Sequence, residues 1–200
     1  MDVRTLRQKF IRWYKRNMLD FQKEIESSIK DDDSATIGEK MFLYGLIRAI
    51  KPEIVLETGT HRGKTTLYMA QALHDNNKGI IFSCDPNIEW EQERNFSLFP
   101  ELKKRIVFKQ IKGENWGSEF LDKKIDLFFC DGFHGKDDVL GELNVFLPLL
   151  SETGIIVFHD CDINEQNDTV GVNYAIKYRG LKNVFINSDN RMRIYGNCGK

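Results

Sequence analysis

Hydrophobic positions follow a helical spacing at the start of the chain. Across residues 4–29, apolar side chains mark one face and basic side chains crowd the other, which predicts an amphipathic helix. An acidic run at 31–34 breaks this pattern, and a second helix with one apolar face is expected over 41–50, before Pro52. The first part of the chain is therefore expected to be helical.

Beyond these helices, short apolar runs alternate with helical patterns. Runs such as 125–130 and 154–158 are almost continuously apolar, which is typical of strands buried on both faces of a parallel sheet. Strands are expected at 53–57, 79–85, 105–110, 125–131, 154–160, 183–187 and 191–196, and helices at 64–75, 89–99, 137–150 and 171–179.

The end of the chain departs from this alternation. Only Ser188-Asp189-Asn190 separates the last two expected strands, which is too short for a crossover helix and predicts an antiparallel hairpin. We therefore expect an α/β fold, a Rossmann-like three-layer sandwich whose seven-stranded sheet is mostly parallel with the last strand antiparallel. This domain is expected over residues 36–200, and an N-terminal amphipathic helix with a linker over residues 1–35.

Composition narrows the class of protein. Two hundred residues suit one domain, and a net charge of −1 gives no field that would attract nucleic acid. No apolar run approaches the ~20 residues that cross a bilayer, and the N-terminus lacks the apolar core of a secretory signal. The four cysteines form no C-x-x-C pair and suit a reducing cytoplasm. The basic helix either packs on the domain or pairs two subunits as a homodimer.

The turn after the first expected strand is the most informative segment. It reads Glu57-Thr58-Gly59-Thr60-His61-Arg62-Gly63-Lys64-Thr65. One interpretation is a phosphate-binding loop, Gly-x-x-x-x-Gly-Lys-Ser/Thr, but the segment is one residue short for that motif. Another is a strand-to-helix turn that passes under a nucleoside, with glycines where Cβ atoms would collide. The third interpretation is an ordinary strand-to-helix connection that binds no ligand.

Polar residues follow five successive expected strands. Because ligands bind beyond the carboxyl ends of parallel strands, these residues are the candidate site. They are Glu57, Asp85, Gly113-Glu114-Asn115, Asp131 with His134, and His159-Asp160. Asp85 lies 26 residues after Gly59, near the offset at which an acid accepts hydrogen bonds from ribose hydroxyls. Asp131 and Asp160 would repel each other unless a proton or a cation lies between them.

Together, these features resemble the class I S-adenosylmethionine-dependent methyltransferases. The first motif of that family, acid-x-Gly-x-x-x-Gly, matches Glu57 to Gly63, and its ribose-binding acid matches Asp85. Its reversed last strand matches the hairpin at 184–195, and the resemblance covers roughly residues 36–196. The sequence is most similar to the small O-methyltransferases of the catechol and caffeoyl-CoA type and to bacterial relatives acting on sugar hydroxyls.

The resemblance implies S-adenosylmethionine as the cofactor and a small-molecule or carbohydrate acceptor that is methylated on a hydroxyl by in-line displacement. Glu57 would face the methionine ammonium, Asp85 the ribose diol, and Glu114 with Asn115 the adenine edge. The residues expected to bind the cofactor are Glu57, Gly59, Thr60, Gly63, Asp85, Gly113, Glu114, Asn115 and Asp131.

The chain departs from these relatives at the catalytic positions. They hold a divalent metal with Asp-x-x-Lys after strand four and Asp-Asn after strand five, whereas this sequence has Asp131-x-x-His134 and His159-Asp160. Asp131 and Asp160 remain as expected metal ligands, and His159 would favour a softer ion than magnesium, or none. Without a metal, His134 or His159 would take the substrate proton. The expected catalytic residues are therefore Asp131, His134 and His159.

Two alternative functions remain open from the residues alone. One is a nucleotide phosphatase or kinase that uses Gly59 to Thr65 for phosphates, with Asp131 on magnesium. The other is a non-catalytic module that binds the adenosyl cofactor or a partner through the basic helix.

Overall fold

The computed structural model describes residues 18–30, 35–87, 90–120, 123–161, 171–186 and 192–196. The chain forms two compact units, Met1–Asp33 and Ser34–Lys200. In the first unit the structure describes one helix, α2 (Leu19–Ser28), so most of the helix expected over 4–29 lies outside the described residues. None of the helices in the described ranges is long and apolar enough to cross a lipid bilayer.

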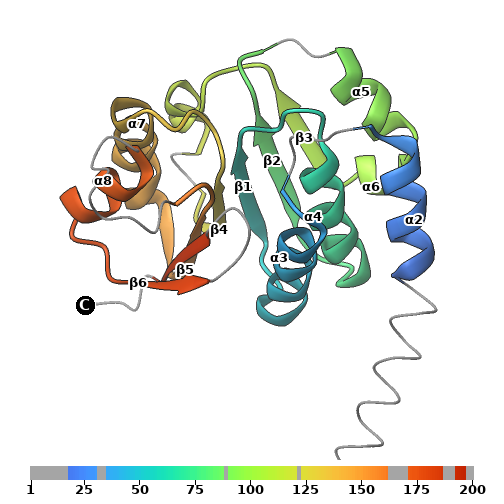
Figure 1. Cartoon of the computed structure of the whole chain (residues 1–200), viewed down its shortest axis with the longest axis horizontal. Helices are drawn as coiled ribbons and strands as arrows, with labels where there is room; N and C mark the ends of the chain where they lie inside the picture. Colours follow the sequence, from blue (N-terminus) through green and yellow to red (C-terminus); the bar gives the residue numbers. More distant parts are fainter. Residues whose placement is uncertain are drawn as a thin grey trace, which may run out of the picture. The chain divides into compact units, whose positions relative to one another are not determined.

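The second unit is built on one seven-stranded sheet, in the order β3-β2-β1-β4-β5-β7-β6 (Figure 1). β7 is antiparallel to both β5 and β6, while β1 to β5 pair in parallel, which confirms the predicted fold class. The strands are β1 (Ile54–Thr58), β2 (Ile80–Cys84), β3 (Ile106–Lys109), β4 (Ile125–Cys130), β5 (Leu150–Phe158), β6 (Asn183–Ile186) and β7 (Met192–Gly196).

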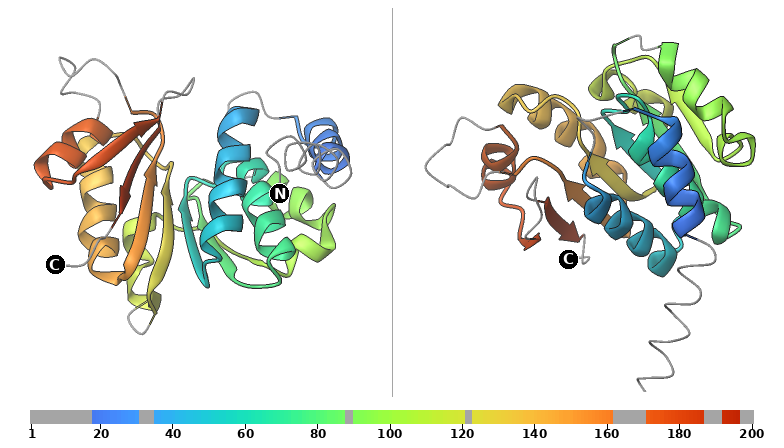
Figure 2. Two further views of the ribbon diagram at one scale, coloured as in Figure 1. Left: turned by 90° about the horizontal axis from the view of Figure 1, so that it is seen from below. Right: turned by 45° about the vertical axis from the view of Figure 1, so that its right-hand side comes forward.

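Helices cover both faces of the sheet, which gives three layers (Figure 2). On one face lie α3 (Ile37–Ile50), α4 (Lys64–Asp75) and α6 (Pro100–Lys103), with α5 (Trp90–Ser97) beside α6. On the other lie α7 (Lys136–Phe146) and α8 (Gly171–Tyr178), with the 3-10 turns η1 (Gly113–Asn115) and η2 (Gly117–Phe120) next to α7. η3 (Leu147–Leu149) follows α7 directly.

Alternation along the central strands assigns each side chain to a face. In β1, Leu56 joins the buried cluster that contains Leu143 and Phe146 of α7. The next residue of the strand, Glu57, points to the opposite face, where its carboxylate meets Thr66 of α4. The pleat therefore sends consecutive residues of the first strand to opposite faces of the sheet.

Three element boundaries differ clearly from the prediction. The helix expected over 137–150 ends at Phe146, because Pro148 has no N–H to continue it, and β5 begins at Leu150 instead of 154. α3 begins at Ile37, before the expected start at 41, because Thr36 and Glu39 form a capping box. Glu39 is buried, and this cap places it at the carboxyl edge of the sheet.

Candidate active site

The glycines of the first turn leave room for other parts of the chain. Gly59 and Gly63 have φ values of 86° and 79°, which disfavour any residue with a side chain. A Cβ on Gly59 would lie 2.0 Å from the carbonyl oxygen of Asp131, and one on Gly63 would lie 2.4 Å from the ring of Phe96. The expectation was that these glycines make room for a ligand. In the structure, they allow the backbone after β4 and a side chain of α5 to pack against the turn.

Glu57 is a buried carboxylate with one oxygen unused. Its Oε2 accepts hydrogen bonds from Thr66 Oγ1 at 2.6 Å and from Ser83 Oγ at 2.5 Å. Its Oε1 has no hydrogen-bond partner among the residues that the structure describes. Burial raises the pKa of Glu57 to about 8, although the two hydroxyl donors oppose this. A cationic ligand group beside Oε1 would remove much of this penalty.

Asp85 ties the end of β2 to the first turn. Its Oδ2 accepts a hydrogen bond from the backbone N–H of His61 at 2.9 Å, and its Oδ1 accepts one from Asn87 at 3.0 Å. Thr60 is fixed at the same place, with its Oγ1 2.6 Å from Ser83 Oγ. Each oxygen of Asp85 retains further acceptor capacity, so the carboxylate can also bind a diol.

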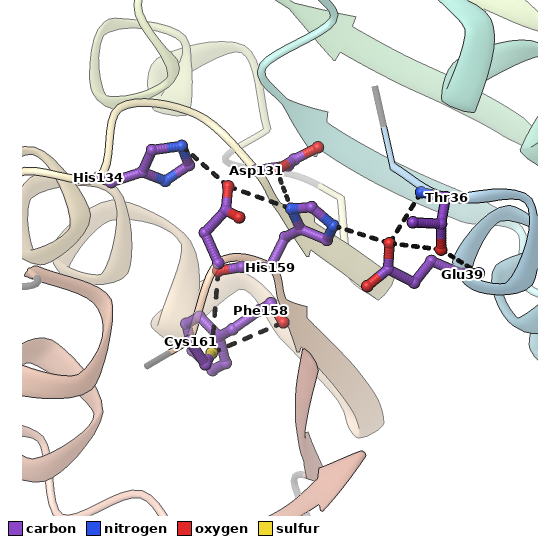
Figure 3. Close-up of polar contacts among 8 residues, drawn as sticks. Thr36, Glu39, Asp131, His134, Phe158, His159 and Cys161 are labelled. Atoms are coloured by element: carbon purple, nitrogen blue, oxygen red, sulfur yellow. Dashed lines mark hydrogen bonds and ion pairs between the residues drawn. The ribbon is translucent and has the colours of Figure 1, made fainter. Parts of the chain in front are cut away.

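The tips of β4 and β5 bring acids and histidines together (Figure 3). His159 is 3% exposed, and its Nδ1 lies 2.9 Å from Asp131 Oδ1 and 3.2 Å from Asp160 Oδ2. Its Nε2 faces Glu39 of α3, at 3.4 Å from Oε2. Asp160, with a φ of 52°, also lies 3.1 Å from Nε2 of His134. Asp160 therefore bridges the two histidines.

Charge balance fixes the state of His159. Burial lowers its pKa, but Asp131, Asp160 and Glu39 outweigh burial and raise it to about 12. Burial acts to raise the pKa of Asp160, but His159 outweighs it and the pKa of Asp160 is lowered. In the protein alone, a proton on His159 thus supplies the positive charge that the carboxylates require, and this ring cannot take up another proton.

The donor set of this cluster also fits a divalent metal. One ligand atom each from Asp131, His159 and Asp160 lies within 4.8 Å of the others. Within the described part of the chain, neither ring nitrogen of His159 has a hydrogen bond aligned with its N–H direction, although carboxylate oxygens are close. One imidazole nitrogen with two carboxylates suits Mn²⁺, Fe²⁺ or Zn²⁺ better than Mg²⁺.

His134 lies at the open side of this cluster, and its side chain is 47% exposed. Its backbone carbonyl accepts a hydrogen bond from Gly171 N–H at the start of α8, at 3.0 Å. A Cβ on Gly171 would lie 2.1 Å from the backbone of Lys136, so α8 holds this loop closely. The neighbouring Phe133 is also exposed, and Lys112 Nζ lies 5.4 Å from its ring.

The expected site residues occupy one edge of the sheet in two groups. Those of the first turn and of β2 lie around Glu57, and those of β4 and β5 lie around His159. Gly113, Glu114 and Asn115 form η1, beside α7. Two buried acids at this edge, Glu39 and Glu142, were not predicted. Thr36-x-x-Glu39 is a readable capping box, but it does not reveal the contact with His159.

Comparison with known proteins identifies the family. A family model described as a methyltransferase domain matches residues 56–161, which is more than half of the chain. The chain therefore belongs to the methyltransferase-domain family. A curated relative, the uncharacterized protein y4gI of Sinorhizobium fredii (strain NBRC 101917 / NGR234), is 23% identical over 147 residues. The aligned part is 68% of this chain and 16% of that protein, so the chain spans a small part of its length.

Solved structures share the fold. One is the O-methyltransferase TomG of Streptomyces achromogenes in complex with SAM, with a TM-score of 0.69, 13% identity, and coverage of 84% of this chain and 83% of that one. The SAH-bound Podospora anserina methyltransferase PaMTH1 has a TM-score of 0.67 and 16% identity, with coverage of 97% of this chain and 95% of that one. The O-methyltransferase of Bacillus cereus in complex with SAH has a TM-score of 0.69 and 12% identity, with coverage of 92% of this chain and 95% of that one.

These findings confirm the predicted methyltransferase domain. They give no support to the phosphate-binding alternative or to the non-catalytic module. At such low identities the solved structures establish a common fold, and the chemistry of this chain must be argued from its own site.

Proposed function

We propose that the protein transfers a methyl group from S-adenosylmethionine to a hydroxyl of a small molecule or sugar. One observation carries this proposal: a buried oxygen of Glu57 with no partner in the described ranges and an exposed His134 beside Asp160 lie at the same edge of the sheet. The first suits the ammonium of the cofactor, and the second suits an acceptor that arrives from solvent.

The cofactor would lie across the carboxyl ends of β1 and β2. Glu57 Oε1 would receive the methionine ammonium, and the free acceptor capacity of Asp85 would hold the ribose diol. Glu114 and Asn115 of η1 would then lie at the adenine edge. TomG, PaMTH1 and the Bacillus cereus enzyme, which share this fold, contain the same cofactor or its product.

His134 is the residue proposed to accept the proton of the acceptor hydroxyl. Its Nε2 lies 3.1 Å from Asp160, so an Nε2–H donated there leaves the lone pair on Nδ1. His159 is unsuited to this role because its raised pKa keeps it protonated. Asp160 would orient His134 and stabilise its charge after proton transfer, as the acid of a catalytic triad does.

Asp131, His159 and Asp160 are the residues that would hold a divalent metal. Such an ion would lower the pKa of a bound hydroxyl. His134, oriented by Asp160, would still receive the proton of the acceptor hydroxyl. Orientation alone can contribute several orders of magnitude in rate.

The test uses His134→Ala, Asp85→Ala and the control His74→Ala, which changes an exposed histidine on α4. Affinity for S-adenosylhomocysteine is measured by calorimetry, and turnover with methyl-labelled cofactor on a panel of phenols, nucleosides and sugars. His134→Ala should lower turnover about 10²–10⁴-fold with cofactor affinity nearly unchanged, because only proton transfer is lost. Asp85→Ala should chiefly weaken cofactor binding.

The control should match the wild type in both measurements. Loss of cofactor affinity in His134→Ala would make this residue a cofactor contact or a structural residue instead of a base. Binding of ATP–magnesium without any binding of S-adenosylhomocysteine would overturn the proposed function itself.

A further inference from the structure

One buried acid is not used by the proposed chemistry. Glu142 lies on α7 and is 6% exposed, on the opposite face of the sheet from Glu57. Its Oε2 accepts a hydrogen bond from Thr58 Oγ1 at 2.9 Å and one from Cys130 Sγ at 3.4 Å. A single oxygen thus joins the last residue of β1 to the last residue of β4.

The other oxygen of Glu142 supports two glycine loops. A Cβ on Gly113 would lie 2.9 Å from Oε1 and 2.6 Å from Thr58 Cγ2. A Cβ on Gly132 would also lie 2.9 Å from Oε1. Any side chain at either position would displace this carboxylate. The backbone segments that follow β3 and β4 therefore pack directly against the carboxylate of Glu142.

The preceding residue of α7 makes a second contact with η1. A Cβ on Gly141 would lie 2.4 Å from Glu114 Oε2, so Glu114 packs directly on the helix. Two consecutive residues of α7 thus fix two consecutive residues of η1, the turn assigned to the adenine edge. The hydrogen bond to Thr58 fixes the first turn to the same side chain.

We propose that Glu142 is a positioning residue that sets the adenine-binding side of the cofactor site. The proposal rests on the proposed function, because it assumes an adenosyl cofactor. Glu142 touches no reacting atom. It holds Thr58, Gly113 and Gly132 at the separation that lets Glu114 and Asn115 read the 6-amino group of adenine. Burial raises the pKa of Glu142 to about 7, as expected for a carboxyl kept for its contacts within the protein.

The experiment compares two ligands that differ at the base. S-adenosylhomocysteine carries the 6-amino group of adenine, and S-inosylhomocysteine carries an oxo group there. Calorimetry gives both affinities for the wild type, Glu142→Gln and Gly113→Ala, which disturbs the same contact from the side of η1. The matched control is Asp137→Asn, an exposed acid of α7.

In the wild type and in Asp137→Asn, the adenine ligand should bind roughly tenfold more tightly or better, because a lost hydrogen bond leaves a polar group unpaired. In Glu142→Gln and Gly113→Ala, affinity for S-adenosylhomocysteine should fall about tenfold and the preference for adenine should shrink toward unity. A residue with only a structural role would lower stability and leave the preference intact. Urea unfolding of every variant separates these two effects.

Retention of the full preference for adenine in both Glu142→Gln and Gly113→Ala would overturn the proposal. That result is distinct from failure of the proposed function, in which the wild type would bind neither ligand.

Discussion

Replacing Glu57 with glutamine should change how stability depends on pH. Glu57 is completely buried, and its pKa is about 8 in the folded protein compared with an ordinary value of 4.5. Between these pH values the folded protein holds a proton that the unfolded chain releases, so stability falls as pH rises. This difference in pKa corresponds to about 5 kcal/mol of unfolding free energy between pH 4.5 and pH 8, at roughly 1.4 kcal/mol for each pH unit.

Glu57→Gln removes this dependence while keeping the shape of the side chain. The amide oxygen can still accept the hydrogen bonds of Thr66 and Ser83. We expect the variant to match or fall slightly below the wild type at pH 5. Relative to the wild type it should then gain about 2–4 kcal/mol between pH 5 and pH 8, with the lower figure applying if water and dipoles relax around the ionised carboxylate.

Urea unfolding of the cofactor-free protein at pH 5, 6, 7 and 8 measures this difference. Glu142, whose pKa is also raised, contributes equally to both proteins and cancels when the two curves are subtracted. Glu152→Gln, an exposed position of β5, is the control and should follow the wild type. If the curves of the wild type and Glu57→Gln run parallel from pH 5 to 8, the argument from burial is wrong.

Two further predictions concern the backbone and the metal. Gly59→Ala should destabilise the fold by about 2 kcal/mol or more, because its Cβ would collide with the carbonyl of Asp131 at a positive φ. Gly45→Ala in α3, whose Cβ would have nothing within 4 Å, should instead stabilise the fold by about 0.5–1 kcal/mol. Urea unfolding measures both variants, and an equal loss of stability in the two would refute the contrast. Mn²⁺ should bind the wild type in a titration followed by electron paramagnetic resonance, and Asp131→Asn should weaken that binding at least about tenfold, because it removes a ligand. Asp137→Asn should leave Mn²⁺ binding unchanged, and equal affinity in all three proteins would place the metal elsewhere.

Much of the fold could be predicted because its signals are local. Continuous apolar runs predict the buried parallel strands, and the three residues between the last two expected strands predict the antiparallel hairpin that β6 and β7 form. The glycine turn and the acids after each strand were expected at one edge of the sheet, and the structure places them there. Each of these inferences needed only neighbouring residues and the spacing typical of strands and helices.

Other features depend on contacts between residues far apart in the chain. Thr58 and Glu142 are 84 positions apart, and their hydrogen bond exists because β1 and β4 pair in one register beneath α7. Glu39 reaches His159 only because α3 lies at the tip of β5. No local pattern specifies either contact.

The sequence by itself determined which side chains stand at the strand ends, because strand and turn propensities act over a few residues. Only the tertiary structure shows which charged groups surround each of them. His159 could be read as a base from the sequence, but three surrounding carboxylates keep its ring protonated. Gly59 could be read as a ligand contact, but in the structure the backbone carbonyl of Asp131 packs against it. Charge and packing depend on distances in space, and only the folded sheet fixes those distances.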